Sequence, residues 1–281
     1  MAIADVVDLL TCPHCAERFA LAADLRSVRC ANGHAFDLAR QGYLNLQGRE
    51  PKNADTAAMV AARDRFLGGG HYGLIADRLS GLVLAVQPES AGLLEVGAGT
   101  GYYLAGVLSG LSDARGVALD VSVAAARRAA KAHPRIGSVV ADAWQRMPLV
   151  EGQLDVILDV FAPRNGAEFR RLLRADGVLL TVTPQPEHLL EVREPLGLLD
   201  IQPGKQGQLA ASLGEHFDQV EHETVEYRVS LGPDALHDLV AMGPNAFHLD
   251  DAAIRERVAP LAAPFEVRVA VDLNVWSPTR P

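Results

Sequence analysis

The sequence predicts a doubly wound, Rossmann-like α/β sheet with a small zinc-ribbon-like module in front of it. Three observations lead to this fold class. From residue 92 onward, apolar runs of strand length alternate with segments of helical periodicity, which is typical of a mainly parallel sheet covered on both faces. The stretch LLEVGAGTG, residues 93–101, joins a strand to a glycine-rich turn, and all the cysteines lie near the N-terminus. We expect a metal-binding module over residues 1–50, a helical cover over 51–88 and the α/β domain over 89–281.

The N-terminal module carries a zinc-ligand pattern. Cys12, Cys15, Cys30 and His34 form two pairs, C-x2-C and C-x3-H. In a chain without a secretion signal this spacing favours structural zinc over a disulfide. Four ligands fill the tetrahedron and leave no position for a substrate water. His14, inside the first pair, is the alternative fourth ligand, but it would have to fold back on its own turn.

The next segment, residues 36–56, interleaves aromatic and basic side chains. Phe36 and Tyr43 alternate with Arg40 and Lys52. Such a mixture can stack on and neutralise an RNA loop. The alternative is that the aromatic residues pack against the zinc module while the charges stay solvated. The sequence leaves both open.

Two helices are expected in the cover. Apolar residues at helical spacing run up to the three glycines 68–70, which stop the first helix, and residues 53–56 offer N-caps for it. A second helix is expected over about 74–86. The body then contains strands near 93–96, 115–119, 138–141, 154–160, 177–182, 220–231 and 265–276, with helices near 102–111, 122–133, 167–174 and 233–242.

The glycine turn favours S-adenosylmethionine as the ligand. Gly97, Gly99 and Gly101 have the spacing G-x-G-x-G, whereas a dinucleotide fingerprint needs G-x-G-x-x-G to place a pyrophosphate on a helix N-terminus. S-adenosylmethionine has no phosphate, and Glu95 at the strand end suits its amino-acid and sulfonium groups. A nucleotide, or a turn with no ligand, is the alternative.

Further polar residues are expected at the same edge of the sheet. Asp120 follows the second strand, about twenty residues beyond the glycine turn, and is placed to accept hydrogen bonds from ribose hydroxyls. Asp142 follows the third strand and suits an adenine amino group, or it caps the following turn. The fourth strand delivers FAPRN, residues 161–165, and a stiff proline loop after the fifth delivers His188, which would otherwise be a surface or capping histidine.

The charge distribution bears on the partner. The net charge of −9 opposes a nucleic-acid partner, but residues 1–87 balance nine basic against nine acidic residues, so the acidic excess lies in residues 88–281. The N-terminus lacks the features of a signal peptide, and no apolar run reaches the roughly 20 residues of a membrane span. We expect a cytoplasmic protein with no membrane partner.

Several stretches together resemble one family. CPHC, CANGHAFDLARQGYLNLQ, RDRFLGGGHYGL, LLEVGAGTGYYLAGVL and FAPRN with TPQPEHLLE are similar to the bacterial 23S ribosomal RNA guanine-N1 methyltransferases along nearly the full chain. DTAAMVAARDRFL, AHPR, VFAPRN and VAMGP resemble the actinobacterial branch associated with macrolide resistance.

The resemblance implies a class I methyltransferase sheet and an RNA-recognising zinc module. It implies Cys12, Cys15, Cys30 and His34 as zinc ligands, and Tyr72, Tyr103, Leu104 and His188 as contacts of S-adenosylmethionine. It further implies a homodimer that methylates N1 of a guanine in a 23S rRNA hairpin loop lining the peptide exit tunnel.

Neither the residues nor the resemblance assigns the proton acceptor for this reaction. Asp159 lies at a suitable strand end without being assigned, and Arg164 and Asn165 are candidates for holding the guanine edge. A small-molecule methyltransferase and a non-enzymatic zinc module that binds RNA are the alternatives.

Overall fold

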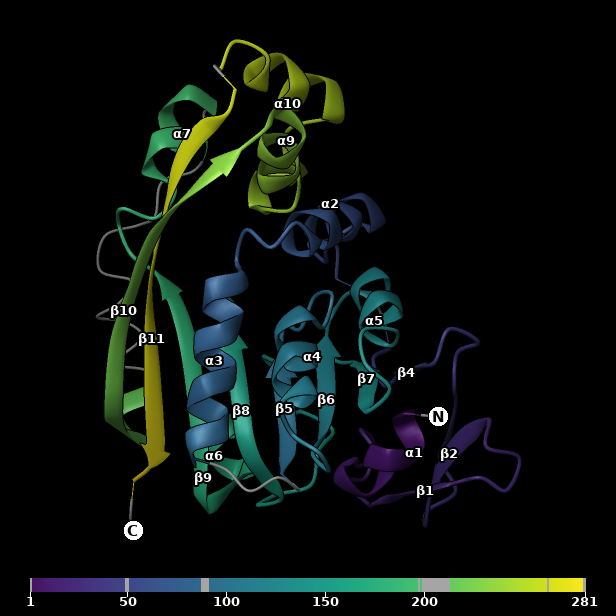
Figure 1. Cartoon of the computed structure of the whole chain (residues 1–281). Coiled ribbons are helices and arrows are strands. Elements are labelled where there is room, and N and C mark those ends of the chain that lie inside the picture. The colour runs from purple at the N-terminus through teal and green to yellow at the C-terminus, as the bar shows by residue number, and fades with distance from the viewer. Residues whose placement is uncertain are drawn as a thin grey trace.

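A mixed sheet of eight strands organises the fold (Figure 1). The computed structural model describes residues 2–48, 51–86, 91–196, 198, 213–261 and 263–279. The predicted boundaries at residues 50 and 88 therefore lie outside the described residues. The strand order is β10-β11-β9-β8-β5-β6-β7-β4. The strands are β4 (Tyr43–Asn45), β5 (Gly92–Val96), β6 (Arg115–Asp120), β7 (Ile136–Val140), β8 (Leu154–Val160), β9 (Leu173–Pro184), β10 (Phe217–Leu231) and β11 (Phe265–Pro278).

The strand directions confirm the doubly wound α/β class. The strands from β4 to β9 pair in parallel, whereas β11 pairs antiparallel with β9 and with β10. Every strand predicted for the body is present, and the order reverses at β5, where two crossovers run in opposite directions. In open parallel sheets such a switch point leaves a crevice at the carboxyl ends of the strands.

Helices cover both faces of the sheet. Figure 1 shows α3 and α4 in front of it, and α4 packs against β5 and β6. The predicted N-cap of α2 is confirmed, because the Thr56 side chain accepts from the Met59 N–H. Ser122 caps α5 in the same way by accepting from the Ala125 N–H. The helices are α1 (Ala2–Val6), α2 (Ala57–Gly68), α3 (Gly73–Val86), α4 (Tyr102–Ser109), α5 (Val123–Ala129), α6 (Gly166–Leu172), α7 (Leu190–Leu196), α9 (Pro233–Ala241) and α10 (Asp251–Val258), with 3-10 turns η1 (Val7–Leu9) and η2 (Pro244–Phe247).

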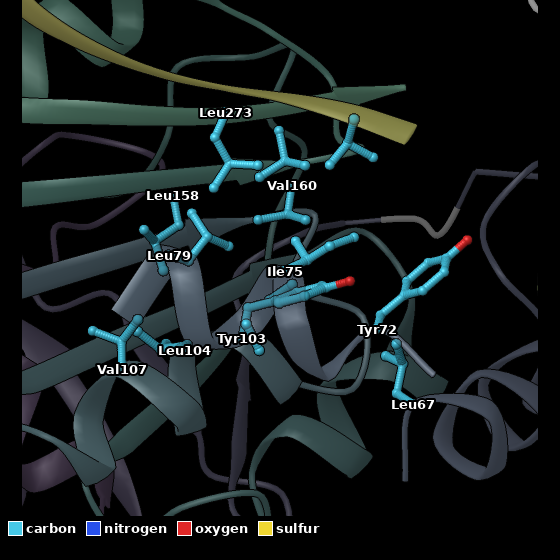
Figure 2. Close-up of a cluster of buried hydrophobic side chains, with 14 of the residues drawn as sticks. Leu67, Tyr72, Ile75, Leu79, Tyr103, Leu104, Val107, Leu158, Val160 and Leu273 are labelled. Carbon is cyan, nitrogen blue, oxygen red and sulfur yellow. The ribbon is translucent and has the colours of Figure 1, made fainter. Parts of the chain in front are cut away.

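The sheet separates the apolar core into two large clusters, one on each face. One cluster joins α3 and α4 to the front face and includes Leu79, Leu104 and Leu158. Figure 2 shows Tyr72 at one side of this cluster and Tyr103 between Tyr72 and Leu104. The other cluster joins the back face to α1, α6 and the N-terminal module. Burial of both faces explains why β5, β7 and β8 are fully buried strands.

The N-terminal module is a three-stranded antiparallel ribbon of β1 (Phe19–Leu21), β2 (Ser27–Cys30) and β3 (Ala35–Asp37). Its buried residues Phe19 and Val28 belong to the back-face core, so the ribbon packs on the sheet. The chain then adds β4 to the sheet edge beside β7. Neither this strand nor α1 was expected from the sequence. The predicted division at residue 50 stays a prediction, although β4 lies N-terminal to it and belongs to the main sheet.

The two aromatic residues of the interleaved segment serve packing. The Phe36 ring lies 5.7 Å from His14 and 5.6 Å from Phe19 within the ribbon. Tyr43 is buried against Ala126 of α5. For these side chains the packing alternative holds, whereas Arg40 is exposed.

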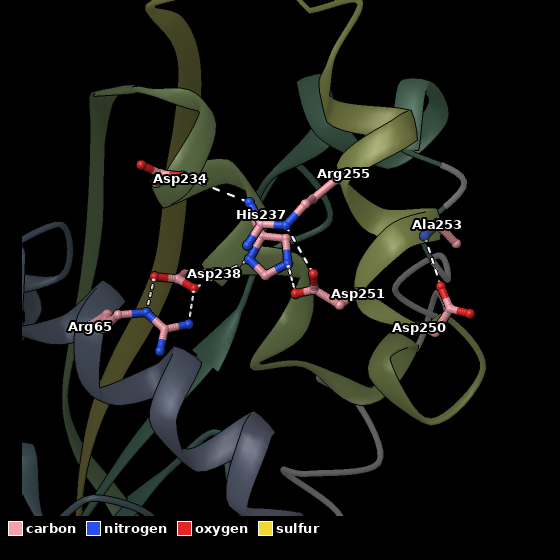
Figure 3. Close-up of polar contacts among 8 residues, drawn as sticks. All are labelled: Arg65, Asp234, His237, Asp238, Asp250, Asp251, Ala253 and Arg255. Atoms are coloured by element: carbon pink, nitrogen blue, oxygen red, sulfur yellow. Dashed lines mark hydrogen bonds and ion pairs between the residues drawn. The ribbon is translucent and has the colours of Figure 1, made fainter.

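Charged contacts attach the cover helix α2 to the C-terminal helices (Figure 3). Arg65 of α2 donates to both carboxylate oxygens of Asp238 on α9, from Nε at 2.9 Å and from Nη2 at 2.6 Å. The adjacent His237 places Nε2 2.8 Å from Asp251 of α10. The bidentate ion pair between Arg65 and Asp238 holds α2 against α9, over the carboxyl ends of the parallel strands.

Candidate active site and metal centre

A cavity of about 430 Å³ opens at the carboxyl ends of four neighbouring parallel strands. Each of β5, β6, β7 and β8 ends in a turn that forms part of the wall. The cover adds Asp55, Arg63 and Tyr72 to this wall. The turns contribute residues 97–100, 119–121, 141–144 and 160–163. The predicted convergence of four strand ends on one crevice is therefore observed.

The glycine turn has a backbone that other residues rarely adopt. Gly97, Gly99 and Gly101 have φ angles of +59°, +54° and +74°. A Cβ on Gly97 would lie 2.9 Å from the Cβ of Ala162, and one on Gly101 would lie 3.2 Å from the Cα of Ala129. Gly97 and Gly99 line the cavity, whereas Gly101 starts α4 behind it. This glycine cradle, residues 97–101, therefore accepts no side chain at Gly97 or Gly101 unless a neighbouring segment moves.

Glu95 ties the glycine turn to α4. Its carboxylate is buried, and Oε2 accepts the Leu104 N–H at 3.2 Å. The Leu104 backbone thereby binds the strand-end carboxylate, while the Leu104 side chain packs in the core. Glu95 lines the cavity, whereas Leu104 does not. Burial raises the pKa of Glu95 to about 8, the Leu104 N–H lowers it, and the negative charge of Asp120 raises it further.

The raised pKa predicts a pH-dependent stability. Folded protein retains a proton on Glu95 that the unfolded chain releases near the ordinary value of 4.5, so the free energy of unfolding falls as pH rises from about 4.5 to 8. Between pH 6.5 and 7.5 we expect the free energy of unfolding of wild type to fall by about 1 kcal/mol more than that of Glu95→Gln. Urea unfolding of cofactor-free protein measures it. Glu151→Gln, on an exposed turn, is the control, and an equal slope in Glu95→Gln would contradict the assignment.

Asp120 and Asp142 both line the cavity and both brace turns. Asp120 accepts the Gly99 N–H at 2.8 Å through Oδ2 and the Ser122 N–H at 2.8 Å through Oδ1. Burial raises the pKa of Asp120. Asp142 accepts the Trp144 N–H at 2.9 Å, which is the turn-capping alternative. The ribose and adenine contacts of these acids stay predictions.

Tyr72 and His188 form a buried pair. The Ala270 N–H donates to His188 Nδ1 at 3.2 Å, and burial lowers the pKa of His188 to about 4, so the neutral ring carries its proton on Nε2. That N–H faces the Tyr72 hydroxyl oxygen at 3.2 Å. Tyr72 and Tyr103 line the cavity, with His188 behind Tyr72. Of the predicted cofactor contacts, His188 is therefore placed to orient Tyr72.

The four predicted metal ligands converge in the ribbon. The Sγ atoms of Cys12, Cys15 and Cys30 each lie 3.5 Å from His34 Nδ1, and all four ligand atoms lie within 4.8 Å of one another. Ligands about 2.0–2.3 Å from a tetrahedral zinc ion are separated by roughly 3.4–3.8 Å, so the set fits zinc. His14 lies outside it, with its ring 5.2 Å from that of His34. The geometry decides between the two histidines in favour of His34.

The comparisons with known proteins agree with both halves of this site. The family model described as RlmA, N-terminal, a zinc ribbon, matches residues 10–53. The chain is 46% identical to the 23S rRNA (guanine(748)-N(1))-methyltransferase of Streptomyces fradiae, with 98% of each chain covered. A Micromonospora griseorubida relative, provisionally named a 23S rRNA (guanine-N(1)-)-methyltransferase, is 45% identical over 98% of this chain and 99% of its own. The chain belongs to the 23S rRNA guanine-N1 methyltransferase family.

Solved structures with lower identity share the fold. A chain in a complex of a Haloferax volcanii methyltransferase with its activator is 16% identical, with a TM-score of 0.51 over 83% of this chain and all of that one. These findings agree with the class I methyltransferase sheet. S-adenosylmethionine is the cofactor of this methyltransferase, and zinc is its structural metal. The glycine cradle and the strand-end acids fit the former, and the Cys3His cluster fits the latter.

The cover of the methyltransferase cavity contains residues that the sequence did not single out. Arg63 of α2 lines the cavity, forms an ion pair with Asp55 and donates from Nη2 to the Met242 carbonyl at 2.8 Å. Met242 directly follows α9 and begins the loop of residues 242–248. Arg63 lies within the RDRFL stretch, but its contact with Met242, 179 residues away, has no local signal.

The polar side chains of Asp159, Arg164 and Asn165 contact other protein groups and do not line the cavity. Asp159 is fully buried, its Oδ1 lies 3.6 Å from Arg164 Nε, and burial raises its pKa to about 7. Asn165 accepts the Glu168 N–H as N-cap of α6 and donates to the Ala143 carbonyl at 3.1 Å. Of the FAPRN stretch, Phe161, Ala162 and Pro163 line the cavity.

Among the described residues, no helix is long and apolar enough to cross a membrane.

Proposed function

We propose that this protein transfers the methyl group of S-adenosylmethionine to N1 of a guanine in a 23S rRNA hairpin loop that lines the peptide exit tunnel. The observation that carries the proposal is the 46% identity over 98% of both chains to a relative named for this reaction. The cavity supports it, because its glycine cradle and acids suit a cofactor without phosphate.

The residues divide the binding task. Asp120 accepts hydrogen bonds from ribose hydroxyls and Asp142 from the adenine amino group, while Gly97 and Gly99 admit the methionine portion to the backbone. Tyr72, oriented by His188, and Tyr103 form the wall near the reacting end. Leu104 and Gly101 hold this wall through the start of α4.

The bound cofactor supplies an electrophilic methyl group on a positively charged sulfur. Because N1 of neutral guanine carries a proton, N1 would have to lose that proton as it accepts the methyl group. Orientation of the base in line with the sulfur–methyl bond is the main task of the protein. The guanine must leave its base stack to enter the cavity at the carboxyl ends of the strands.

RNA contact is assigned to the ribbon and to pairing of two chains. Arg26, Arg29 and Arg40 are exposed on or beside the ribbon, within the part of the chain whose charges balance. Their guanidinium groups suit phosphate contact. A homodimer would bring two such surfaces around one RNA. We further propose a cytoplasmic enzyme that confers macrolide resistance, in line with the family branch that the sequence resembles.

Primer extension tests the reaction, because methylation at N1 blocks base pairing. We expect 23S rRNA from cells lacking the gene to accept one methyl group from labelled S-adenosylmethionine and to acquire one new stop in the tunnel-lining hairpin. Asp120→Ala is the inactive control. Labelled RNA without a stop in that hairpin would reject the target, and absence of labelling would reject RNA methylation.

Two further measurements separate the alternatives. Calorimetric titration with S-adenosylmethionine is expected to show binding, and its absence would favour a non-enzymatic zinc module. Binding without labelling of RNA would favour a small-molecule methyltransferase. Expression in a macrolide-sensitive host is expected to raise the inhibitory concentration, with Asp120→Ala as the control.

A further inference from the structure

Phe161, the first residue after β8, has a backbone conformation that is rare for a bulky side chain. Its φ angle is +56°, in the left-handed region that favours glycine. The side chain is 39% exposed and lines the cavity. Core packing does not account for an exposed aromatic ring on an unfavourable backbone. Conformations of this kind persist where the surrounding structure enforces them, and they cluster at functional sites.

The position of Phe161 relative to the cofactor turn is fixed by its neighbours. Ala162 approaches Gly97 so closely that a Cβ on that glycine would lie 2.9 Å from the Ala162 Cβ, and 3.5 Å from Pro163 Cδ. The backbone after Phe161 therefore passes directly over the turn that holds the cofactor. Phe161 lines the same cavity as Gly97 and Gly99 of that turn.

Two buried rings support Phe161. The centroid of its ring lies 6.1 Å from that of Tyr72 and 5.9 Å from that of His188. Tyr72 and His188 are themselves buried and joined by a contact of 3.2 Å. Leu189, which follows His188, also has a left-handed backbone, with φ of +58°. The buried rings of Tyr72 and His188 thus pack beside the Phe161 ring, which is exposed to the cavity.

The other side chains of FAPRN are unsuited to hold the base. Arg164 faces the buried Asp159, and Asn165 is engaged in capping α6. The segment consequently presents one large group to the cavity, and that group is an aromatic ring. A ring binds the face of a purine and leaves the purine edge free, which is the arrangement that transfer to an edge nitrogen requires.

We propose that Phe161 is the platform on which the target guanine stacks during methyl transfer. This inference rests on the proposed function and adds to it a substrate-contacting residue. Stacking on Phe161 holds the plane of the extruded base beside the cofactor turn, so that N1 reaches the methyl group in line. The ring is a positioning surface and takes no part in moving the proton.

Methyl transfer to unmodified 23S rRNA in the full-length protein, over a range of RNA concentrations, tests the proposal. Phe161→Leu keeps an apolar side chain on the same backbone but removes the ring face. We expect kcat/KM for RNA to fall about 5- to 150-fold, the range that loss of one base–aromatic stack implies. The dissociation constant of S-adenosylmethionine, measured by calorimetry, stays within about 3-fold. Phe161→Trp retains a ring and keeps most of the activity.

Two controls separate stacking from folding. Phe161→Gly removes the ring but suits the φ of +56°, so thermal stability is retained while transfer falls as in Phe161→Leu. Phe247→Leu removes another exposed aromatic ring, one that does not line the cavity, and keeps wild-type activity. Equal activity of wild type and Phe161→Leu would overturn the stacking role alone. Failure of wild type to methylate 23S rRNA would overturn the proposed function and the stacking role together.

Discussion

Replacing Gly97 with alanine is expected to weaken S-adenosylmethionine binding by about 5- to 150-fold and to lower methyl transfer at limiting cofactor by a similar factor. The new Cβ would lie 2.9 Å from the Ala162 Cβ, and the φ of +59° disfavours any side chain. Relief of the clash requires the glycine turn and the segment after β8 to move apart, and overpacking of this kind costs roughly 1–3 kcal/mol. Calorimetry gives the dissociation constant, and RNA labelling gives the activity.

Gly152→Ala is the matched control for Gly97→Ala. Gly152 has nearly the same φ, +61°, but a Cβ there would have no neighbour within 4 Å. It therefore carries the backbone strain, about 1–2 kcal/mol, without the clash. We expect a lower melting temperature and unchanged cofactor binding. If both variants lost binding equally, general destabilisation rather than the shape of the cradle would be the cause.

The elements that the sequence predicted are those with a local signal. Strands β5 and β8 are mostly apolar, with Glu95 as the acid in β5 and Asp155 and Asp159 as the acids in β8. Helix α2 has both a capping residue and a glycine stop, so neighbouring residues determine all three elements. The three-residue strand β4 exists because β7 offers it a sheet edge, and three residues show no periodicity. The short helix α1 depends on a close approach at Gly137, where a Cβ would meet Val6 at 2.2 Å.

The candidate site divides in the same way. Glycine and cysteine spacings are constraints on short segments, so the cradle and the zinc ligands were predictable from the residues themselves. Arg63 and Met242 meet across 179 positions, and only the folded chain brings them to one cavity. The role of His188 behind Tyr72 likewise depends on the Ala270 N–H of a distant strand. The sequence predicted that His188 lies near the cofactor, but it could not show that the Tyr72 ring, and not the His188 ring, lines the cavity.

Loss of the metal is expected to have the second large effect. His34→Ala removes one of four ligands, and we expect the purified protein to lose its one zinc per chain on dialysis against a chelator. Structural zinc contributes about 10–16 kcal/mol in small zinc modules, so residues 12–37 should unfold and become sensitive to protease. His14→Ala is the matched control, because His14 packs on Phe36 outside the ligand set. Zinc loss in His14→Ala alone would reverse the ligand assignment.

The same pair of variants tests whether the ribbon is an independent module. Phe19 and Val28 share one buried cluster with Leu94 of the central strand β5. Unfolding of the ribbon exposes that cluster, so His34→Ala should lower the melting temperature of the whole chain and weaken S-adenosylmethionine binding indirectly. An unchanged melting temperature of the body after zinc loss would instead support the predicted division at residue 50. In that case the zinc would serve RNA recognition alone, and methyl transfer, but not cofactor binding, would be lost.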